Sequence, residues 1–371
     1  MTLPRYITGI LGLAILIWGL GTAAVILCAS AGNQVDAAMG QHTIFQTEAK
    51  IVVYNTPTIA HMADKPEVVV LGASNANLGL RPAQLSPQLD GVPVHNLSIG
   101  GQNMRTLSQL VDLIYRQTPP EQHRNIVFVI GAWYGLMIED KRRWPTGLSD
   151  VDQEMLRYGL FRKSGNHEAE FKLPNSFLSA SLASVWPLMV PYAWYSELGR
   201  YAFNILGKNV LAFGLQNTII MSWYPSENER NTTVMTDEQF SAEMKSFTAY
   251  VGSTTEWGDS GFHDLTALAH RIHDEGGQLV VLDMPLTSWA QKPDLFPLYQ
   301  TRMQATITPL QDAHMVHYAS LLPDFTDTSF FDAVHPRPKV TTEIARLAAE
   351  PIRHALETLS SLSTPPSRKN P

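Results

Sequence analysis

Short apolar runs alternate with amphipathic stretches from residue 66 onward. Five runs are continuous and rich in β-branched residues, which is typical of strands buried on both faces of a parallel sheet. Alternating strands and helices predict a three-layer α/β fold with a five-stranded parallel sheet. The expected strands are Val68–Leu71, Val92–Leu97, Ile126–Ile130, Leu279–Leu282 and Met315–Tyr318, and the expected helices are Gln102–Arg116, Gly261–Asp274, Pro293–Leu310 and Val340–Leu359.

The amino-terminal 35 residues have a different character. No charged residue occurs from Tyr6 to Val35, and about 20 apolar residues suffice to cross a bilayer as a helix. Because Arg5 precedes the run, the positive-inside rule places the amino terminus in the cytoplasm and the remainder outside. Residues 1–35 are therefore interpreted as a membrane anchor. A cleaved signal peptide is the alternative, although the run exceeds the roughly 7–15 apolar residues of a signal core.

The rest of the chain divides by its pattern. Residues 36–65 form a polar connector, 66–360 an α/β domain, and 361–371 a disordered tail. The stretch 141–258 interrupts the alternation of strands and helices, and it contains two uncharged runs, 174–196 and 209–226. Prolines, serines and amides within these runs disfavour membrane spans. We therefore expect a helical insertion that packs on the side of the domain.

Composition narrows the class of protein. A hydrophobic content of 44% is that of a globular chain, and the net charge of -7 disfavours nucleic-acid binding. The single cysteine, Cys28, excludes an internal disulfide framework and any multi-cysteine metal site. No pattern indicates a metal, nucleotide or redox cofactor, so none is expected.

Three residues suggest nucleophilic catalysis. Ser74 directly follows the first expected strand, and Asp332 and His335 lie in a loop after the last one. The carboxyl ends of parallel strands meet at one edge of a sheet, where such folds bind ligands. A serine hydroxyl needs an imidazole to take its proton, and that imidazole needs an acidic group to fix its tautomer. The alternative is a serine in a simple turn beside a helix-capping aspartate.

At these positions the chain resembles the SGNH (GDSL-like) hydrolases, which have a flavodoxin-like fold. Their first motif is Gly-Asp-Ser, and here it reads Gly72-Ala73-Ser74. Their Asp-x-x-His motif is matched by Asp332 and His335, and "NLSIGGQN" resembles the block that gives a glycine amide, here Gly101, to the oxyanion hole. The resemblance spans roughly residues 66–140 and 260–358. It implies a Ser-His-Asp triad, with the Ser74 amide also in the oxyanion hole.

One motif of that family departs from its pattern. The third motif, Gly-x-Asn-Asp, supplies an asparagine to the oxyanion hole, but here the chain reads Gly131-Ala132-Trp133-Tyr134. Asn75 and the indole of Trp133 are the candidate replacement donors. Trp133 and Tyr134 are also candidates for an acceptor pocket that binds a sugar ring.

The resemblance also implies a function. Membrane-anchored relatives include O-acyltransferases of cell-wall and secreted polysaccharides, which work beside a multi-span membrane acyltransferase. We therefore expect an O-acyltransferase, in the periplasm on the bacterial inner membrane, that acetylates a secreted or cell-surface polysaccharide through acyl-Ser74. A carbohydrate acetyl esterase is the alternative enzyme, and a non-catalytic polysaccharide-assembly scaffold is the alternative outside enzymes.

Overall fold

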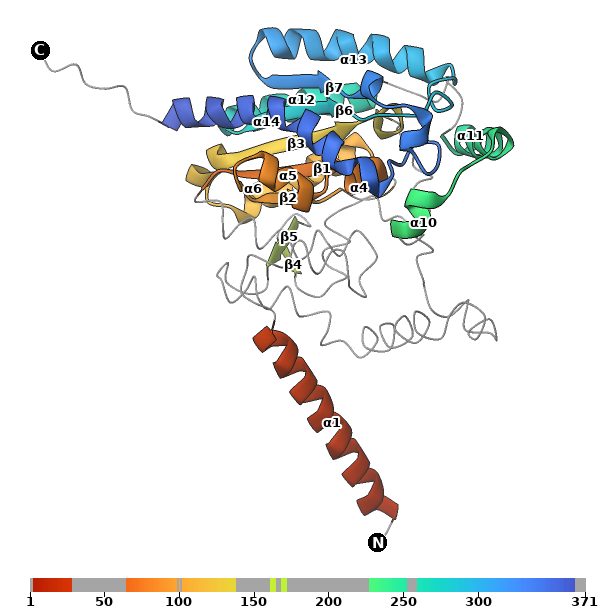
Figure 1. Ribbon diagram of the computed structural model, residues 1–371. Coiled ribbons are helices and arrows are strands. Elements are labelled where there is room, and N and C mark those ends of the chain that lie inside the picture. Colours follow the sequence, from red (N-terminus) through yellow and green to blue (C-terminus); the bar gives the residue numbers. More distant parts are fainter. Residues whose placement is uncertain are drawn as a thin grey trace, which may run out of the picture.

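The computed structural model describes residues 3–28, 65–98, 100, 102–137, 161–164, 168–171, 227–251 and 259–363. A five-stranded sheet, in the upper part of Figure 1, has the strand order β2-β1-β3-β6-β7, and all neighbouring strands are parallel. This is the α/β arrangement with a five-stranded parallel sheet that the sequence predicts, and its order is consistent with a flavodoxin-like fold. The strands are β1 (Glu67–Gly72), β2 (Val94–Asn96), β3 (Ile126–Ala132), β6 (Gln278–Asp283) and β7 (Val316–Ser320).

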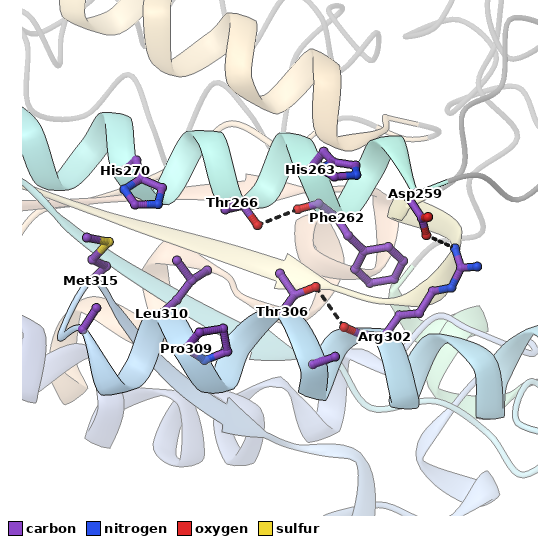
Figure 2. A pocket seen from close by; sticks show the side chains of 12 residues that line it. Asp259, Phe262, His263, Thr266, His270, Arg302, Thr306, Pro309, Leu310 and Met315 are labelled. Carbon is purple, nitrogen blue, oxygen red and sulfur yellow. Dashed lines mark hydrogen bonds and ion pairs between the residues drawn. The ribbon is translucent and has the colours of Figure 1, made fainter.

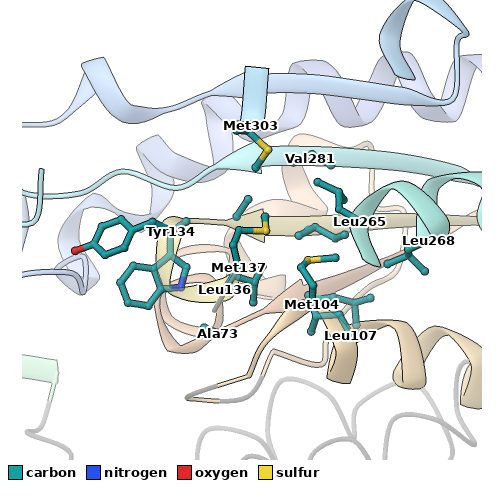
Figure 3. Packing of buried hydrophobic residues seen from close by; sticks show 14 of the residues in the cluster. Ala73, Met104, Leu107, Tyr134, Leu136, Met137, Leu265, Leu268, Val281 and Met303 are labelled. Carbon is teal, nitrogen blue, oxygen red and sulfur yellow. The ribbon is translucent and has the colours of Figure 1, made fainter. Parts of the chain in front are cut away.

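Helices cover both faces of this sheet. Successive side chains of a strand point to opposite faces, so Val69 and Leu71 belong to one core and Val68 and Val70 to the other. Figure 3 shows part of the first core, where α6, α12 and α13 pack. The helices of this face are α6 (Met104–Gln117), α12 (Ser260–Asp274) and α13 (Leu295–Asp312), and those of the other are α4 (Ser74–Gly79), α5 (Pro82–Gln88) and α14 (Thr341–Ser363).

The switch in winding direction positions the site. From β1 the chain crosses to β2 on one side, and it then returns to β3 on the other side. The crevice where a parallel sheet binds its ligands lies at this point, outside the carboxyl ends of β1 and β3. β1 and β3 pair along the whole of β1, from Glu67 opposite Ile126 to Gly72 opposite Gly131. Ser74 therefore emerges directly beside the switch point.

The insertion is only partly described. Within it, β4 (Phe161–Ser164) pairs antiparallel with β5 (Glu168–Phe171), so the described part is not entirely helical. Its last elements are α10 (Glu227–Thr232) and α11 (Asp237–Val251). Phe240 and Met244 of α11 belong to the first core. An insertion that ends at residue 258 thus includes a helix that contributes to the core of the α/β domain.

At the amino terminus, α1 (Leu3–Cys28) is one continuous helix of 26 residues. Its exposed large apolar side chains, among those whose placement is described, are Tyr6, Ile7, Ile10, Leu11, Leu13, Ile15, Leu16, Ile17 and Leu20, each 49–66% exposed. No helix within the described residues combines the length and apolar character that crossing a membrane requires. The anchor at 1–35 stays a prediction. The connector up to residue 64 and the last eight residues lie outside the described part of the chain.

Candidate active site

Ser74 begins helix α4, two residues after β1 ends. Two glycines let this helix approach the strands closely: a Cβ at Gly72 would lie 2.6 Å from the Ala76 Cβ, and one at Gly131 would lie 2.5 Å from it. Any larger residue at these positions would push α4 off the ends of β1 and β3. The side chain of Ser74 is partly exposed, whereas its neighbours Ala73 and Asn75 are buried. The fold thus presents the hydroxyl at the edge of the sheet.

Asparagine side chains tie α4 to the segment after β2. Asn96 Nδ2 donates to the carbonyl oxygens of Ala76 (3.1 Å) and Leu80 (2.8 Å), while its Oδ1 accepts from the Ser98 amide at 2.9 Å. Asn77 Nδ2 in turn donates to the Ser98 carbonyl at 2.8 Å. These bonds hold the serine helix against the "NLSIGGQN" segment. Sequence reasoning missed Asn96 and Asn77, although both lie in or beside stretches that it singled out.

The Asp332–His335 loop is closed on itself. Phe330 and Pro336 form an isolated antiparallel bridge, and the Phe331 amide donates to the His335 carbonyl at 3.2 Å. The Asp332 Oδ1 atom accepts from the backbone amides of Val334 (3.0 Å) and His335 (2.8 Å). An aspartate that bonds the amides two and three residues ahead is a common turn-forming device. Here it also fixes the carboxylate relative to the imidazole.

Ser74, His335 and Asp332 form a continuous hydrogen-bonded relay. Ser74 Oγ lies 2.7 Å from His335 Nε2, and Asp332 Oδ2 lies 2.6 Å from His335 Nδ1. A carboxylate only accepts hydrogen bonds, so Nδ1 carries the proton and Nε2 is left to accept from the serine hydroxyl. The imidazole and the carboxylate are each 18% exposed, so a small molecule can reach the relay. This is the arrangement that activates a serine as a nucleophile.

Of the expected oxyanion donors, the structure describes Asn75 but not Gly101. Asn75 is 1% exposed, and its Oδ1 accepts from the Ala76 amide at 2.9 Å. Its Nδ2 is buried without a hydrogen-bond partner among the residues that the structure describes. A buried amide group with an unused N–H beside Ser74 can donate a hydrogen bond to a negative charge that develops there. Gly101 lies outside the described residues.

Trp133 and Tyr134 pack into the protein interior. Trp133 is 4% exposed and Tyr134 is 1% exposed, and both belong to the first core. Their rings contact each other at 5.2 Å, and Tyr134 makes edge contacts with Phe296 and Tyr299. Figure 3 shows Tyr134 at one end of this cluster. In this structure, therefore, neither ring exposes a face on which a sugar could stack.

Three further residues hold the Asp332–His335 loop, and sequence reasoning assigned none of them a role. Arg337 donates from Nε to the Thr328 carbonyl at 2.9 Å and from Nη1 to the Arg230 carbonyl at 2.8 Å. Thr287 and Glu243 each bond the backbone of Ala333. Arg337 lies within the "FFDAVHPRP" segment, where its proximity to His335 was a usable signal. Glu243 precedes the loop by 90 residues, and no local pattern marks it.

A second buried carboxylate lies at the same edge of the sheet. Asp283 ends β6 and is 4% exposed, and it accepts hydrogen bonds from the hydroxyls of Tyr299 and Tyr318. Burial raises the pKa of Asp283 to about 6, although both phenol hydrogen bonds act in the opposite direction. Its bonds to two tyrosines make it a structural group that is separate from the serine relay.

The described cavity of about 650 Å³ between α12 and α13 contains no member of the relay. Figure 2 shows this cavity, with Phe262 and Thr266 on one wall and Thr306 and Leu310 on the other. At one end Asp259 and Arg302 form an ion pair. The two threonine hydroxyls of this cavity donate to backbone carbonyls, those of Phe262 and Arg302, and not to a histidine. The hydrogen-bonded relay is therefore the candidate active site.

No protein-family model matches the chain, and a search of the curated proteins finds no significant relative. The interpretation of the site accordingly depends on its own residues. These residues are linked by their order along the chain, by their positions at strand ends and by hydrogen-bonding distances.

Proposed function

We propose that this protein is a serine-dependent acyl-transfer enzyme, and that it transfers an O-acyl group, with acetyl as the lead candidate, to a secreted or cell-surface polysaccharide. The observation that carries the proposal is the relay in which Ser74 Oγ meets His335 Nε2 at 2.7 Å and Asp332 meets His335 Nδ1 at 2.6 Å. The motif resemblance to SGNH hydrolases supports the same chemistry. A non-catalytic scaffold would not require a serine, a histidine and an aspartate joined by hydrogen bonds in this order.

In the first half-reaction, Ser74 Oγ attacks the carbonyl carbon of the acyl donor and its proton passes to His335 Nε2. The tetrahedral intermediate then collapses, the donor's leaving group takes the proton from His335, and an ester on Ser74 remains. Asp332 stays ionised and stabilises the imidazolium that forms between these steps. The negative charge on the intermediate is met by the Ser74 amide, by the Nδ2 of Asn75 and, in this proposal, by the Gly101 amide.

In the second half-reaction, His335 takes a proton from an acceptor hydroxyl, whose oxygen attacks the acyl carbon. Collapse returns the proton to Ser74 Oγ and releases the new ester. When the acceptor is a sugar hydroxyl the enzyme is a transferase, and when it is water the enzyme is a carbohydrate acetyl esterase. The burial of Trp133 and Tyr134 favours this second candidate, because these two residues expose no sugar-binding face. Transfer then requires an acceptor surface from other parts of the chain.

The proposal includes a cellular location for the protein. We further propose, from the uncharged run between Tyr6 and Val35, that the protein is anchored in the bacterial inner membrane with the α/β domain in the periplasm. There the acceptor polysaccharide is accessible, and a multi-span membrane acyltransferase would supply the acyl group. No metal, cofactor or nucleic acid enters this scheme.

A two-part experiment tests the function. A fluorophosphonate probe should label Ser74 in the full chain, and mass spectrometry should locate the adduct on that residue. An activated acetyl ester, supplied with and without an oligosaccharide, should then give acetylated sugar for a transferase or only free acetate for an esterase. Failure of the probe to react with Ser74 would reject both enzymatic candidates.

A further inference from the structure

Two side chains from outside the catalytic loop hold its apex. The Ala333 amide donates to Glu243 Oε2 at 3.1 Å, and Thr287 Oγ1 donates to the Ala333 carbonyl at 2.6 Å. Glu243 lies on α11, whereas Thr287 follows β6. Ala333 separates Asp332 from Val334 in the loop that ends at His335. Both of its backbone polar groups are therefore fixed by elements remote in sequence.

The two supports differ in charge. Thr287 is neutral and completely buried, whereas Glu243 is a half-buried carboxyl group. Burial raises the pKa of Glu243, and the negative charge of Asp332 raises it further, while the Ala333 amide and His335 act in the opposite direction. Glu243 thus supports the loop with an ionisable group, bonded to the residue that follows Asp332. Thr287 can affect the positions of Asp332 and His335 but contributes no charge.

The other charged groups around the loop occupy distinct places. The Arg230 guanidinium lies 5.9 Å from the centre of the Phe331 ring, and that ring stacks on His335 at 5.7 Å. Arg337 directs its guanidinium to backbone carbonyls, including those of Thr328 and Arg230. Glu243 is consequently the carboxylate, besides Asp332, that the described contacts bring to this loop.

We propose that Glu243 is a positioning residue of the relay, which holds the turn between Asp332 and His335 through the Ala333 amide and adds a negative charge beside that turn. The role depends on the proposed acyl-transfer function. A negative charge favours the charged form of a nearby imidazole, so removing the charge of Glu243 is expected to change the pH dependence of the relay. At the same time, its bond to the Ala333 amide holds the turn that aims the imidazole at Ser74.

Glu243→Gln separates the two parts of this role. The amide oxygen of glutamine can still accept from the Ala333 amide, but the negative charge is removed. The titration midpoint of the His335 ring should therefore fall by about half a pH unit, the size expected for the loss of one partly screened charge. The acid limb of Ser74 labelling by the fluorophosphonate probe should move by the same amount in the same direction.

Two matched variants control the experiment. Thr287→Val removes the neutral support of Ala333, so it should slow labelling severalfold and leave the His335 midpoint unchanged. Glu238→Gln removes an equal charge from the same helix at a fully exposed position, so it should change neither quantity. A shift of the midpoint in Glu243→Gln alone is the result that supports the inference.

The measurement uses the full chain in detergent micelles, with ¹³C-labelled histidine and a His335→Gln variant to assign the ring signal by NMR. An unchanged midpoint in Glu243→Gln, or an equal shift in Glu238→Gln, overturns the role of Glu243. Absence of Ser74 labelling at every pH in the wild-type chain instead rejects the acyl-transfer function. The NMR midpoint still decides the Glu243 role in that case, because it requires no turnover.

Discussion

Two aspartates at the same edge of the sheet have different surroundings. Asp332 is 18% exposed and accepts from two backbone amides and an imidazole. Asp283 is 4% exposed and accepts from two phenols, and burial raises its pKa to about 6. Backbone amides near solvent surround the first carboxylate, whereas burial beside two phenols favours the neutral form of the second. The surroundings of Asp332 are therefore those of a group that can assist a reaction, and the surroundings of Asp283 are those of a structural group in the core.

The largest expected effect comes from the members of the relay. Ser74→Ala should abolish fluorophosphonate labelling, since no other atom can form the adduct at that position. Asp332→Asn should lower the labelling rate by about 10⁴-fold, because an amide in place of the carboxylate favours the wrong imidazole tautomer. Thermal melting should change little in Ser74→Ala, whose side chain is partly exposed. Labelling of Asp332→Asn at the wild-type rate would remove Asp332 from the relay.

Asp283→Asn is the matched change at the other aspartate, and it should leave labelling within a factor of a few. An asparagine can accept from one tyrosine hydroxyl and donate to the other, so the cluster keeps its hydrogen bonds. A loss of labelling as large as that of Asp332→Asn would mean that both carboxyl groups serve the chemistry, and the distinction between them would fail.

The next effect concerns Asn75, the proposed oxyanion donor beside Ser74. Asn75→Ala should reduce the labelling rate by about 10²-fold, the usual cost of losing one oxyanion donor. Ser98→Ala is the control, because its buried hydroxyl also lacks a hydrogen-bond partner among the described residues, but it belongs to the segment after β2. If both variants label equally fast, Asn75 has no role in stabilising the charge.

The sequence predicted the fold and the relay for one physical reason. Buried parallel strands need continuous apolar runs, and strand ends share an edge, so Ser74, Asp332 and His335 were expected at one place. All five expected strands and all four expected helices are present. Short helices α4 and α5 were missed because six or seven residues carry too little periodicity. The contact of Glu243 with Ala333 was missed because it arises from tertiary packing. The burial of Trp133 and Tyr134 likewise depends on helices distant in sequence.

Asp283 should also make stability depend on pH. Its folded pKa of about 6 exceeds the ordinary aspartate value, so the folded state binds the proton more tightly than the unfolded chain. The free energy of unfolding should therefore fall as pH rises from about 4 to 6, by roughly 3 kcal/mol from this group. Urea denaturation of wild type and Asp283→Asn across this range measures the difference. A constant difference between the two curves would show that Asp283 does not titrate in that window.

The smallest effect isolates one hydrogen bond of the buried cluster. Tyr318 donates to Asp283 Oδ2 at 2.8 Å, and this bond favours the charged carboxylate. Tyr318→Phe should therefore cost about 1.5 kcal/mol of unfolding free energy above pH 7, where Asp283 is ionised, and less below pH 4. The control is Tyr115→Phe, because the buried Tyr115 hydroxyl has no hydrogen-bond partner within the described part of the chain, and its removal should be nearly neutral. Equal losses at both pH values would mean that Tyr318 contributes packing alone, and that the charge on Asp283 is stabilised by Tyr299.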